Sequence, residues 1–444
     1  MSRTQSLGNV STKQQRIAKL AREAPEMAFT TLAHYIDLDW LYMAYRHTRK
    51  DGATGVDGQT AKDYEANLMM NLRSLLDRAK SGTYQAPPVR RVYIPKTDGT
   101  NRPLGIPAFE DKVLQRAVVM LLEPLYEQDF YDCSYGFRPG RSAHQALEAG
   151  QYKLMGIGGG WVLELDIRKY FDTIDHGQLR KVLSRRVRDG VLVRLIGKWL
   201  NAGVMAEGEL SYPEAGTPQG GVVSPLLANT YLHEVLDEWF EKEVKPRMKG
   251  EAFLIRYADD AVLAFEREED ARRVHSVLPK RFGKYALEIH PEKTKLLDFR
   301  KPKRKDEDKG GKPGSFDFLG FTHYWAKSLK GNWVVKRKTA MSRFRRAVTR
   351  INEWCRMNRH MPLEDQHRIL TQKLRGHYGY YGITGNSWWI SKFCYQVKRL
   401  WRKWLSRRSQ RGRINWEQFK QVLKRFVLPP PIPIHSTYRR AAKP

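Results

Sequence analysis

The sequence FLIRYADDAVLAF occupies residues 253–265, and the rest of the chain is interpreted from it. Apolar runs flank Tyr257-Ala258-Asp259-Asp260 on both sides, which predicts two short strands joined at a tight turn. Two adjacent carboxylates at such a tip raise each other's pKa unless a cation lies nearby. Because carboxylate oxygens are preferred ligands of Mg²⁺ and Mn²⁺, the turn is a candidate metal site. A solvated Asp-Asp turn is the common alternative.

A third carboxylate lies at the end of another predicted strand. Residues 161–172 read WVLELDIRKYFD, in which Trp161–Leu165 has the pattern of a strand and Asp166 follows directly. Acidic residues that end two apolar strands can meet if those strands are neighbours in one sheet. Such a cluster would suit two-metal, in-line phosphoryl transfer, in which the ions activate the attacking oxygen and stabilise the leaving oxygen. Periodicity alone does not establish that the strands are neighbours.

The order of three motifs carries a family resemblance. The run GTPQGGVVSPLLAN at residues 216–229 lies between the Asp166 strand and the Tyr-Ala-Asp-Asp box. In this order the motifs resemble those of reverse transcriptases, and the 216–229 run resembles that of group II intron-encoded reverse transcriptases, or maturases. The resemblance extends from about Thr54 to about Leu428. It implies a catalytic centre with two Mg²⁺ ions, Mn²⁺ being possible, held by three catalytic carboxylates and one backbone carbonyl: Asp166, Asp259, Asp260 and Ile167.

Composition independently points to a polyanionic partner. The 444 residues carry a formal net charge of +31, and proteins this basic usually bind nucleic acid, with an anionic membrane surface as the second choice. No apolar run is long enough to span a bilayer, and the N-terminus lacks the apolar segment of a signal peptide. The cysteines, Cys133, Cys355 and Cys394, have no zinc spacing, which fits a reducing cytosol.

A basic hairpin is predicted at residues 89–107, VRRVYIPKTDGTNRPLGIP. Alternating residues precede Asp98-Gly99, a strong turn signal. Lys96 and Arg102 straddle this turn, and by themselves they are best explained as solvated residues on an exposed hairpin. The fingers hairpin of the family carries matching cations against the incoming nucleotide, so the resemblance implies that Lys96 and Arg102 grip a triphosphate.

Further substrate contacts also follow from the resemblance. Phe171 corresponds to the bulky aromatic residue that excludes a 2′-hydroxyl and so selects deoxynucleotides, although an ordinary core phenylalanine is the alternative. Gln219 stands among glycines that allow a close backbone approach, and it is expected to hydrogen-bond the nucleotide. Arg138 and Arg141 are expected to contact the template backbone. In LEIHPEKTKL, residues 287–296, Lys293 best matches the lysine near the leaving pyrophosphate, and Lys295 is the second candidate.

The C-terminal part is the most basic. Nine Lys or Arg residues stand between Lys336 and His360 against one acidic residue, and Lys398–Arg413 contains eight Lys or Arg and no acid. Apolar residues recur at helical spacing, so these segments are predicted to be helices with one packed face and one cationic face that follows phosphates. The run 374–386 resembles the maturase-specific thumb, which holds the template–primer duplex and intron RNA.

These observations predict an α+β fold of the right-hand polymerase type, with fingers and an antiparallel palm sheet followed by an all-α thumb/maturase domain. The expected parts are an N-terminal extension with the start of the fingers (1–85), fingers and palm (86–325), thumb/maturase domain (326–428) and a Pro-rich basic tail (429–444). Residues 179–200 are expected to form one helix. The relatives' C-terminal zinc-containing endonuclease domain is not expected here, and neither is DNA cleavage.

The predicted function is RNA-directed DNA polymerisation together with binding of group II intron RNA to assist splicing and retrohoming. The partners would be an RNA template with a DNA primer, deoxynucleoside triphosphates, intron RNA and target DNA, in the bacterial cytosol or nucleoid and away from membranes. Two alternatives stay open. One is a domesticated reverse transcriptase serving DNA repair or phage defence. The other is a non-enzymatic RNA-binding splicing factor, which the three intact carboxylates argue against.

Overall fold

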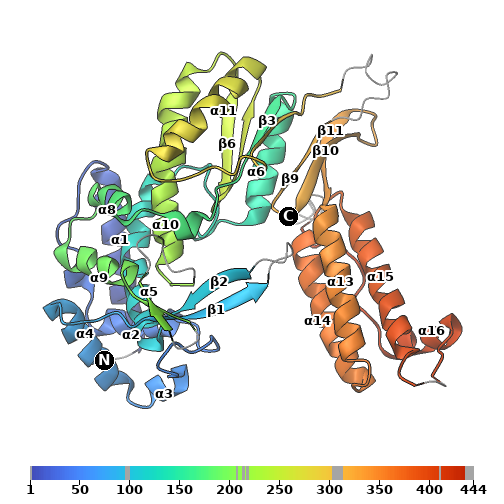
Figure 1. Ribbon diagram of the computed structural model, residues 1–444, viewed down its shortest axis with the longest axis horizontal. Coiled ribbons are helices and arrows are strands. Elements are labelled where there is room, and N and C mark those ends of the chain that lie inside the picture. The colour runs from blue at the N-terminus through green and yellow to red at the C-terminus, as the bar shows by residue number, and fades with distance from the viewer. Residues whose placement is uncertain are drawn as a thin grey trace. The chain divides into compact units, whose positions relative to one another are not determined.

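The computed structural model describes residues 3–95, 101–206, 209–212, 216, 220–302, 314–409 and 412–435, with side chains from residue 9 onward. The chain divides into two compact units, Met1–Asp298 and Phe299–Pro444. Unit 1 combines sheets and helices, whereas unit 2 has a small sheet followed by helices (Figure 1). This arrangement confirms the predicted α+β class and the helices of the C-terminal part, but the prediction that the basic segment is helical from Lys336 is wrong at its start, because Trp333–Thr339 form a strand and the helix begins at Met341. The finer boundaries at residues 85, 325 and 428 stay predictions.

The central sheet of unit 1 has the strand order β6-β7-β3-β8 and is antiparallel throughout. The strands β6 and β7 are buried almost completely and β3 mostly so, which is why these segments read as nearly continuous apolar runs. Helices α6 and α11 pack against this sheet (Figure 1). The strands and helices are β3 Trp161–Leu165, β6 Ala252–Tyr257, β7 Asp260–Phe265, β8 Lys295–Asp298, α6 Ala143–Gly156 and α11 Glu268–Gly283.

A second sheet in unit 1 has the order β2-β1-β4-β5. The strands β1 and β2 form the predicted basic hairpin, with Ile94 opposite Arg102. Residues 96–100, including Lys96, lie outside the described part of the chain. The strands are β1 Val89–Pro95, β2 Asn101–Ile106, β4 Val204–Ala206 and β5 Glu209–Ser211.

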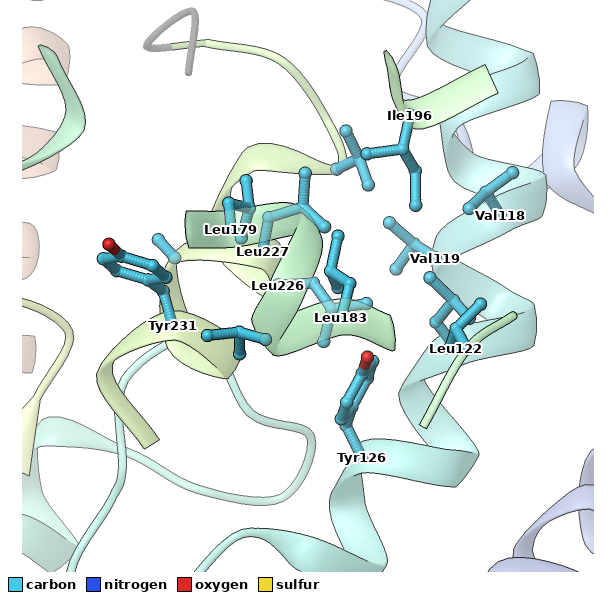
Figure 2. Packing of buried hydrophobic residues seen from close by; sticks show 14 of the residues in the cluster. Val118, Val119, Leu122, Tyr126, Leu179, Leu183, Ile196, Leu226, Leu227 and Tyr231 are labelled. Carbon is cyan, nitrogen blue, oxygen red and sulfur yellow. The ribbon is translucent and has the colours of Figure 1, made fainter. Parts of the chain in front are cut away.

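One hydrophobic core joins the helices of unit 1 to its central sheet. Figure 2 shows side chains from α5, α8, α9 and α10 facing one another within it. The helix α5 is apolar on most sides because other helices surround it. The helices are α1 Arg3–Glu23, α2 Leu38–His47, α3 Ala61–Glu65, α4 Leu68–Ser81, α5 Phe109–Asp129, α7 Tyr170–Thr173, α8 His176–Ser184, α9 Gly190–Leu200 and α10 Ser224–Leu232, which continues as π-helical turns over His233–Glu238 and Phe240–Val244.

The prediction of one helix over residues 179–200 is wrong, because α8 ends at Ser184 and α9 begins at Gly190. Asp189 causes the break. Its buried carboxylate caps α9 by accepting from the Val191 and Leu192 amides, and it also accepts from the Leu32 amide at 2.6 Å. A distant segment therefore interrupts a pattern that is continuous in sequence.

Unit 2 begins with a three-stranded antiparallel sheet, ordered β11-β10-β9, and continues with four described helices. Residues Phe316–Phe321 form the β9–β10 turn, with Phe321 opposite Phe318. Helices α13 and α14 both pack against α15. The elements are β9 Ser315–Phe318, β10 Phe321–Lys327, β11 Trp333–Thr339, α13 Met341–Met357, α14 Leu363–Tyr381, α15 Ser387–Leu405 and α16 Trp416–Arg425.

Two findings concern membrane spans and disulfide bonds. Throughout the described ranges, every helix falls short of the length and apolar character that crossing a bilayer requires. Cys133, Cys355 and Cys394 are all free and buried, as expected of a chain without disulfide bonds.

Candidate active site

The Tyr-Ala-Asp-Asp box forms the tip of the β6–β7 hairpin, as predicted. Tyr257 and Asp260 pair directly, so Ala258 and Asp259 are the two turn residues. Ala258 has a φ of 56°, in the left-handed region that a two-residue hairpin turn requires. The side chain of Asp259 is half-buried and that of Asp260 is exposed. The hairpin therefore presents two carboxylates at one end of the sheet.

Asp166 lies at the same end. The strands β3 and β7 are neighbours, with Leu165 opposite Ala261, so the next residues in the register are Asp166 and Asp260. The expectation that the two acidic strands pair is confirmed. We call Asp166, Asp259 and Asp260 the carboxylate edge.

The charge at this edge is only partly balanced. Burial raises the pKa of Asp259, and the negative charge of Asp166 raises it further. Arg102 from β2 and the buried Arg256 act in the opposite direction, but the pKa of Asp259 stays above its ordinary value. The basic hairpin therefore reaches close enough to the carboxylate edge to act on it electrostatically, as the prediction for Arg102 requires.

A buried arginine holds the turn from behind, and sequence reasoning missed it. Arg256 is fully buried and donates to both carboxylate oxygens of Asp237, at 2.7 and 2.5 Å. It also donates to the Asn229 side chain at 2.9 Å, to the Ala258 carbonyl at 3.0 Å and to Ser134 Oγ at 2.8 Å. Charge-assisted bonds of this kind are strong and directional. The signal in the sequence is an arginine inside an otherwise apolar strand, which needs a buried partner.

A glycine lets a second segment approach the same turn. A Cβ atom on Gly136 would lie 2.3 Å from the Ala258 amide nitrogen, closer than atoms can approach. The Gly136 carbonyl accepts from Asn229 Nδ2 at 2.6 Å, which ties this segment to the Arg256 network. The turn is thus enclosed by backbone on one side and by Arg256 on the other.

The segment after Asp166 leaves a carbonyl available. Ile167 and Ile289 form an isolated antiparallel bridge whose two bonds, at 2.8 Å each, come from the flanking residues. In a pair of this type the central residues use neither their amide nor their carbonyl groups. The Ile167 carbonyl is thus not engaged by the bridge, as its predicted role requires.

The two candidate lysines have different surroundings. Lys293 Nζ lies 3.8 Å from Asp166 Oδ2. Thr294 Oγ1 lies 3.4 Å from the Asp166 amide and anchors the lysine's loop. Lys295 instead begins β8 and pairs in register with Glu164. Of the two, Lys293 is the one that reaches the carboxylate edge.

Two described glycines of the 216–229 run make close approaches, Gly216 to the 170–174 turn and Gly220 to the basic hairpin. A Cβ atom on Gly216 would be 2.9 Å from the Phe171 carbonyl oxygen, and one on Gly220 would be 2.4 Å from that of Gly105 in β2. Phe171 is half-buried and packs partly against the core, so steric selection and a packing role are compatible. Gln219 lies outside the described residues, and its expected nucleotide contact stays a prediction.

The end of this loop has an anchor that sequence reasoning also missed. The Gln115 side-chain oxygen accepts from the Val222 and Val223 amides at 2.7 and 3.2 Å. Its Nε2 donates to Asp111, whose pKa burial raises to about 6. Polar residues at buried helical positions of α5 are the available signal, because such groups need partners.

The expectation for Arg138 is wrong. Its side chain is 4% exposed and pairs with Glu127 at 3.0 Å, while also donating to the Tyr131 and Ser134 carbonyls. A guanidinium committed to these partners shapes the loop and cannot meet a template. Arg141 pairs with Asp132 at the surface.

The donors at the carboxylate edge fit a hard divalent cation. Three carboxylates and the Ile167 carbonyl supply oxygen only, which Mg²⁺ and Mn²⁺ prefer. Burial, with a smaller contribution from the charge of Asp166, raises the pKa of Asp259, so a cation at this edge would stabilise its ionised form. Over the described ranges, no three His, Cys, Asp or Glu side chains converge closely enough to hold a metal ion as they stand.

Comparisons with known proteins agree with this geometry. The sequence profile of the family described as reverse transcriptase (RNA-dependent DNA polymerase) matches residues 94–323. Protein YkfC of Escherichia coli is 38% identical over 286 residues, covering 57% of this chain and 75% of that protein. Group II intron-encoded protein LtrA of Lactococcus lactis is 40% identical over 226 residues, covering 50% of this chain and 37% of LtrA. Nuclear intron maturase 2 of Arabidopsis thaliana is 31% identical over 177 residues, covering 31% of this chain and 24% of that protein.

Proposed function

The chain belongs to the reverse transcriptase family of RNA-dependent DNA polymerases, and we propose that it extends a DNA primer on an RNA template at the carboxylate edge. The observation that carries the proposal is the strand register, which brings Asp166 beside the Asp259-Asp260 turn. Two divalent ions, most simply Mg²⁺, would activate the attacking hydroxyl and stabilise the leaving oxygen when bound. The ligands would be the carboxylate edge and the Ile167 carbonyl.

The reaction is a nucleotidyl transfer. The primer 3′-oxygen forms a bond to the α-phosphorus of a deoxynucleoside triphosphate, and the bond from that phosphorus to the bridging oxygen breaks. The hydroxyl proton is lost, and pyrophosphate leaves. Because the bond changes are simple, the protein contributes mainly positioning and charge stabilisation.

The surrounding residues have separate roles. Arg102 would hold the triphosphate, together with Lys96 from the same hairpin. Lys293, which lies 3.8 Å from Asp166, would stabilise or protonate the leaving pyrophosphate. Phe171 would exclude a ribose 2′-hydroxyl, and Gln219 would orient the nucleotide.

The second unit would bind the nucleic acid and serve a maturase role. LtrA is named as intron-encoded, and the Arabidopsis relative as an intron maturase. The aligned part covers 37% of LtrA, so intron splicing, retrohoming and target-DNA use are proposed from the names and from this chain's own surface. We expect these activities in the cytosol or nucleoid of a bacterium, in keeping with three free cysteines.

A cationic groove in unit 2 supports phosphate binding. A hollow of about 340 Å³ is lined by residues of α13, α14 and α15. Its cations are Arg343, Arg346, Arg350 and Lys373, and none of the other lining residues is acidic: Ala347, Ile351, His377, Tyr381 and Phe393. Burial lowers the pKa of His377 to about 4, so the histidine is neutral at pH 7 and adds no charge. The groove therefore suits the backbone of a nucleic acid.

Primer extension tests the proposal. The intact chain should extend an oligo-dT primer on poly-A in the presence of Mg²⁺, and Asp259→Ala should abolish extension while keeping tight, salt-sensitive RNA binding. Asp172→Ala is the matched control, because Asp172 is an exposed carboxylate one residue past Phe171 and outside the carboxylate edge. Equal activity of the Asp259 variant would overturn the assignment. Failure of both proteins to extend, with RNA binding retained, would favour a non-enzymatic splicing factor.

A further inference from the structure

The outer face of α15 has a composition that polymerisation does not require. Its buried face packs through apolar side chains against α13 and α14. The opposite face alternates aromatic and cationic residues three or four positions apart, so they follow one line along the helix. We call this line the aromatic–cationic stripe, and it consists of Trp388, Lys392, Tyr395, Arg399 and Arg402, with Trp416 of α16 beside its end.

The aromatic rings of the stripe are exposed although large rings are normally buried. Trp388 is 60% exposed, Tyr395 54% and Trp416 39%. Their neighbour Trp389 behaves differently, because it is half-buried and packs edge-on against Phe344. Exposure is thus confined to the stripe and is not a general property of this helix. Aromatic rings held at a surface mark a binding face.

Cations accompany each ring. Lys392 Nζ lies 4.5 Å from the centre of the Trp388 ring, and the Arg399 guanidinium lies 5.8 Å from that of Tyr395. Arg402 lies 4.3 Å from the ring centre of Trp416. These contacts hold the charges beside the aromatic faces, where they can meet phosphates of a chain whose bases stack on the rings.

Charge selects the kind of partner. The sequence has no Asp or Glu between Asp365 and Glu417, so α15 itself carries cations and no acid. Exposed Trp and Tyr are also common at protein interfaces, but a partner here must be strongly anionic. A nucleic-acid duplex is anionic but hides the faces of its bases in the stack, whereas unpaired bases expose them.

We propose that the aromatic–cationic stripe binds an unpaired segment of RNA, with bases stacked on Trp388 and Tyr395 and phosphates near Lys392 and Arg399. The inference deepens the proposed function, since it assumes that RNA is a partner of unit 2. It adds a distinction by strandedness: the stripe would stack exposed bases on its exposed rings, whereas the cationic groove of α13, α14 and α15 offers mainly its four cations to phosphates. The stripe spans about 20 Å from Trp388 to Arg402 at the helical rise, enough for a few nucleotides.

Binding measurements on the full chain test the stripe. The probes are a short oligouridylate and the same strand paired with oligoadenylate, in EDTA and without nucleotides, so that a failure of polymerisation does not affect the result. Trp388→Ala and Tyr395→Ala should each weaken binding of the single strand about tenfold, with little change for the duplex. Tyr152→Ala is the matched control, because Tyr152 is 81% exposed on α6 of unit 1. Circular dichroism checks that each variant is folded.

The salt dependence separates stacking from charge. Lys392→Gln and Arg399→Gln should each lower the slope of log affinity against log salt by about 0.7 for the single strand, whereas the ring variants should leave the slope unchanged. Arg272→Gln on α11 is the control, because the Arg272 side chain pairs with Glu268. It should change neither the salt slope nor the affinity for the single strand.

Crosslinking locates the contact. Oligouridylate containing 4-thiouridine should crosslink to the peptides that carry Trp388 or Tyr395, and pairing should abolish these crosslinks. Equal crosslinking of the single strand and the duplex, or an equal loss of affinity for these two probes, would overturn the proposal and make the stripe a duplex contact. No crosslink and no loss for either probe would also overturn it, and would leave a different anionic macromolecule as the partner.

Discussion

The Asp-Asp turn of unit 1 and the aromatic–cationic stripe of unit 2 are both charged, but they are built in opposite ways. The turn is held by buried contacts. Arg256 donates to the Ala258 carbonyl from one side, and the backbone of Gly136 packs directly against Ala258 on the other. The rings of the stripe are exposed, and its cations lie beside neighbouring rings, with Arg402 also donating to the Ile414 carbonyl at 3.2 Å. One region depends on a few exact positions, and the other on the sum of many similar groups.

This difference predicts how each region responds to substitution. A buried charge that loses its partner keeps its full desolvation cost, so single changes near the turn should be severe. Surface cations act through screened, additive electrostatics, so single changes there should be mild.

Arg256→Met should have the largest effect. It leaves Asp237 buried without its main partner, and we expect unit 1 to lose about 3–5 kcal/mol of unfolding free energy. Native-state hydrogen exchange of the β6 and β7 amides measures this loss in unit 1 alone. The control is Arg272→Ala, an exposed i,i+4 pair with Glu268, which should cost less than about 0.5 kcal/mol. Equal losses in the two variants would refute the buried-network account.

Gly136→Ala should have the second largest effect, because it changes the geometry of the turn and not its charge. The added Cβ would lie 2.3 Å from the Ala258 amide nitrogen, so the turn must move. A displacement of this order is expected to lower kcat about 10²-fold. The matched control is Gly156→Ala, where the added atom meets nothing within 4 Å. Steady-state primer extension compares them, and an unchanged kcat in Gly136→Ala would mean that the turn tolerates displacement.

Lys293→Ala should lower kcat by about ten- to a hundredfold if, as proposed, the lysine near Asp166 assists the leaving group. Lys295→Ala should have little effect, since Lys295 pairs with Glu164 in the sheet register. Lys293→Arg distinguishes the two possible roles. If a positive charge suffices, Lys293→Arg should restore activity. It should not restore the pH profile that a general acid would give. The reverse ranking of the two alanine variants would assign the role to Lys295.

Asp259→Asn should raise the Tm of the metal-free protein by about 2–3 °C. A carboxyl whose folded pKa lies above its unfolded pKa destabilises the fold once it is ionised, and burial raises the pKa of Asp259. The gain should thus be present at pH 7 and disappear as the pH falls through the pKa of Asp259. Mg²⁺ should raise the Tm of the native chain and not that of the variant. Equal shifts would place the ion elsewhere.

Arg350→Gln in the cationic groove should have the smallest effect. We expect a few-fold loss in RNA affinity and a decrease of about 0.9 in the salt slope for a duplex. Arg345→Gln is the control, because Arg345 is exposed on the same helix but does not line the groove. Combining Arg350→Gln with Arg343→Gln should be additive, since no buried partner couples them. A collapse of binding in either single variant would contradict the distributed character of this unit.

Local patterns in the sequence determined much of the catalytic region. The apolar runs on both sides of Tyr257-Ala258-Asp259-Asp260 predicted the hairpin, and the Trp161–Leu165 strand ends where its pattern ends. The strongly cationic helices of the C-terminal part were also predicted, because helical spacing and charge are properties of neighbouring residues. These features depend on interactions within a few positions of each other.

Tertiary structure decided which of these local elements meet. The pairing of β3 with β7 brings Asp166 beside Asp260, and periodicity does not encode such a partner. The break at Asp189 comes from the Leu32 amide, and the burial of Arg138 comes from Glu127. In the sequence, Arg256 is a single charged residue within an apolar strand. Only the structure shows its five hydrogen bonds. Burial and partnership arise between residues far apart in the chain, so the sequence determined the chemical groups, and only the fold determined which of them are exposed, paired or brought together.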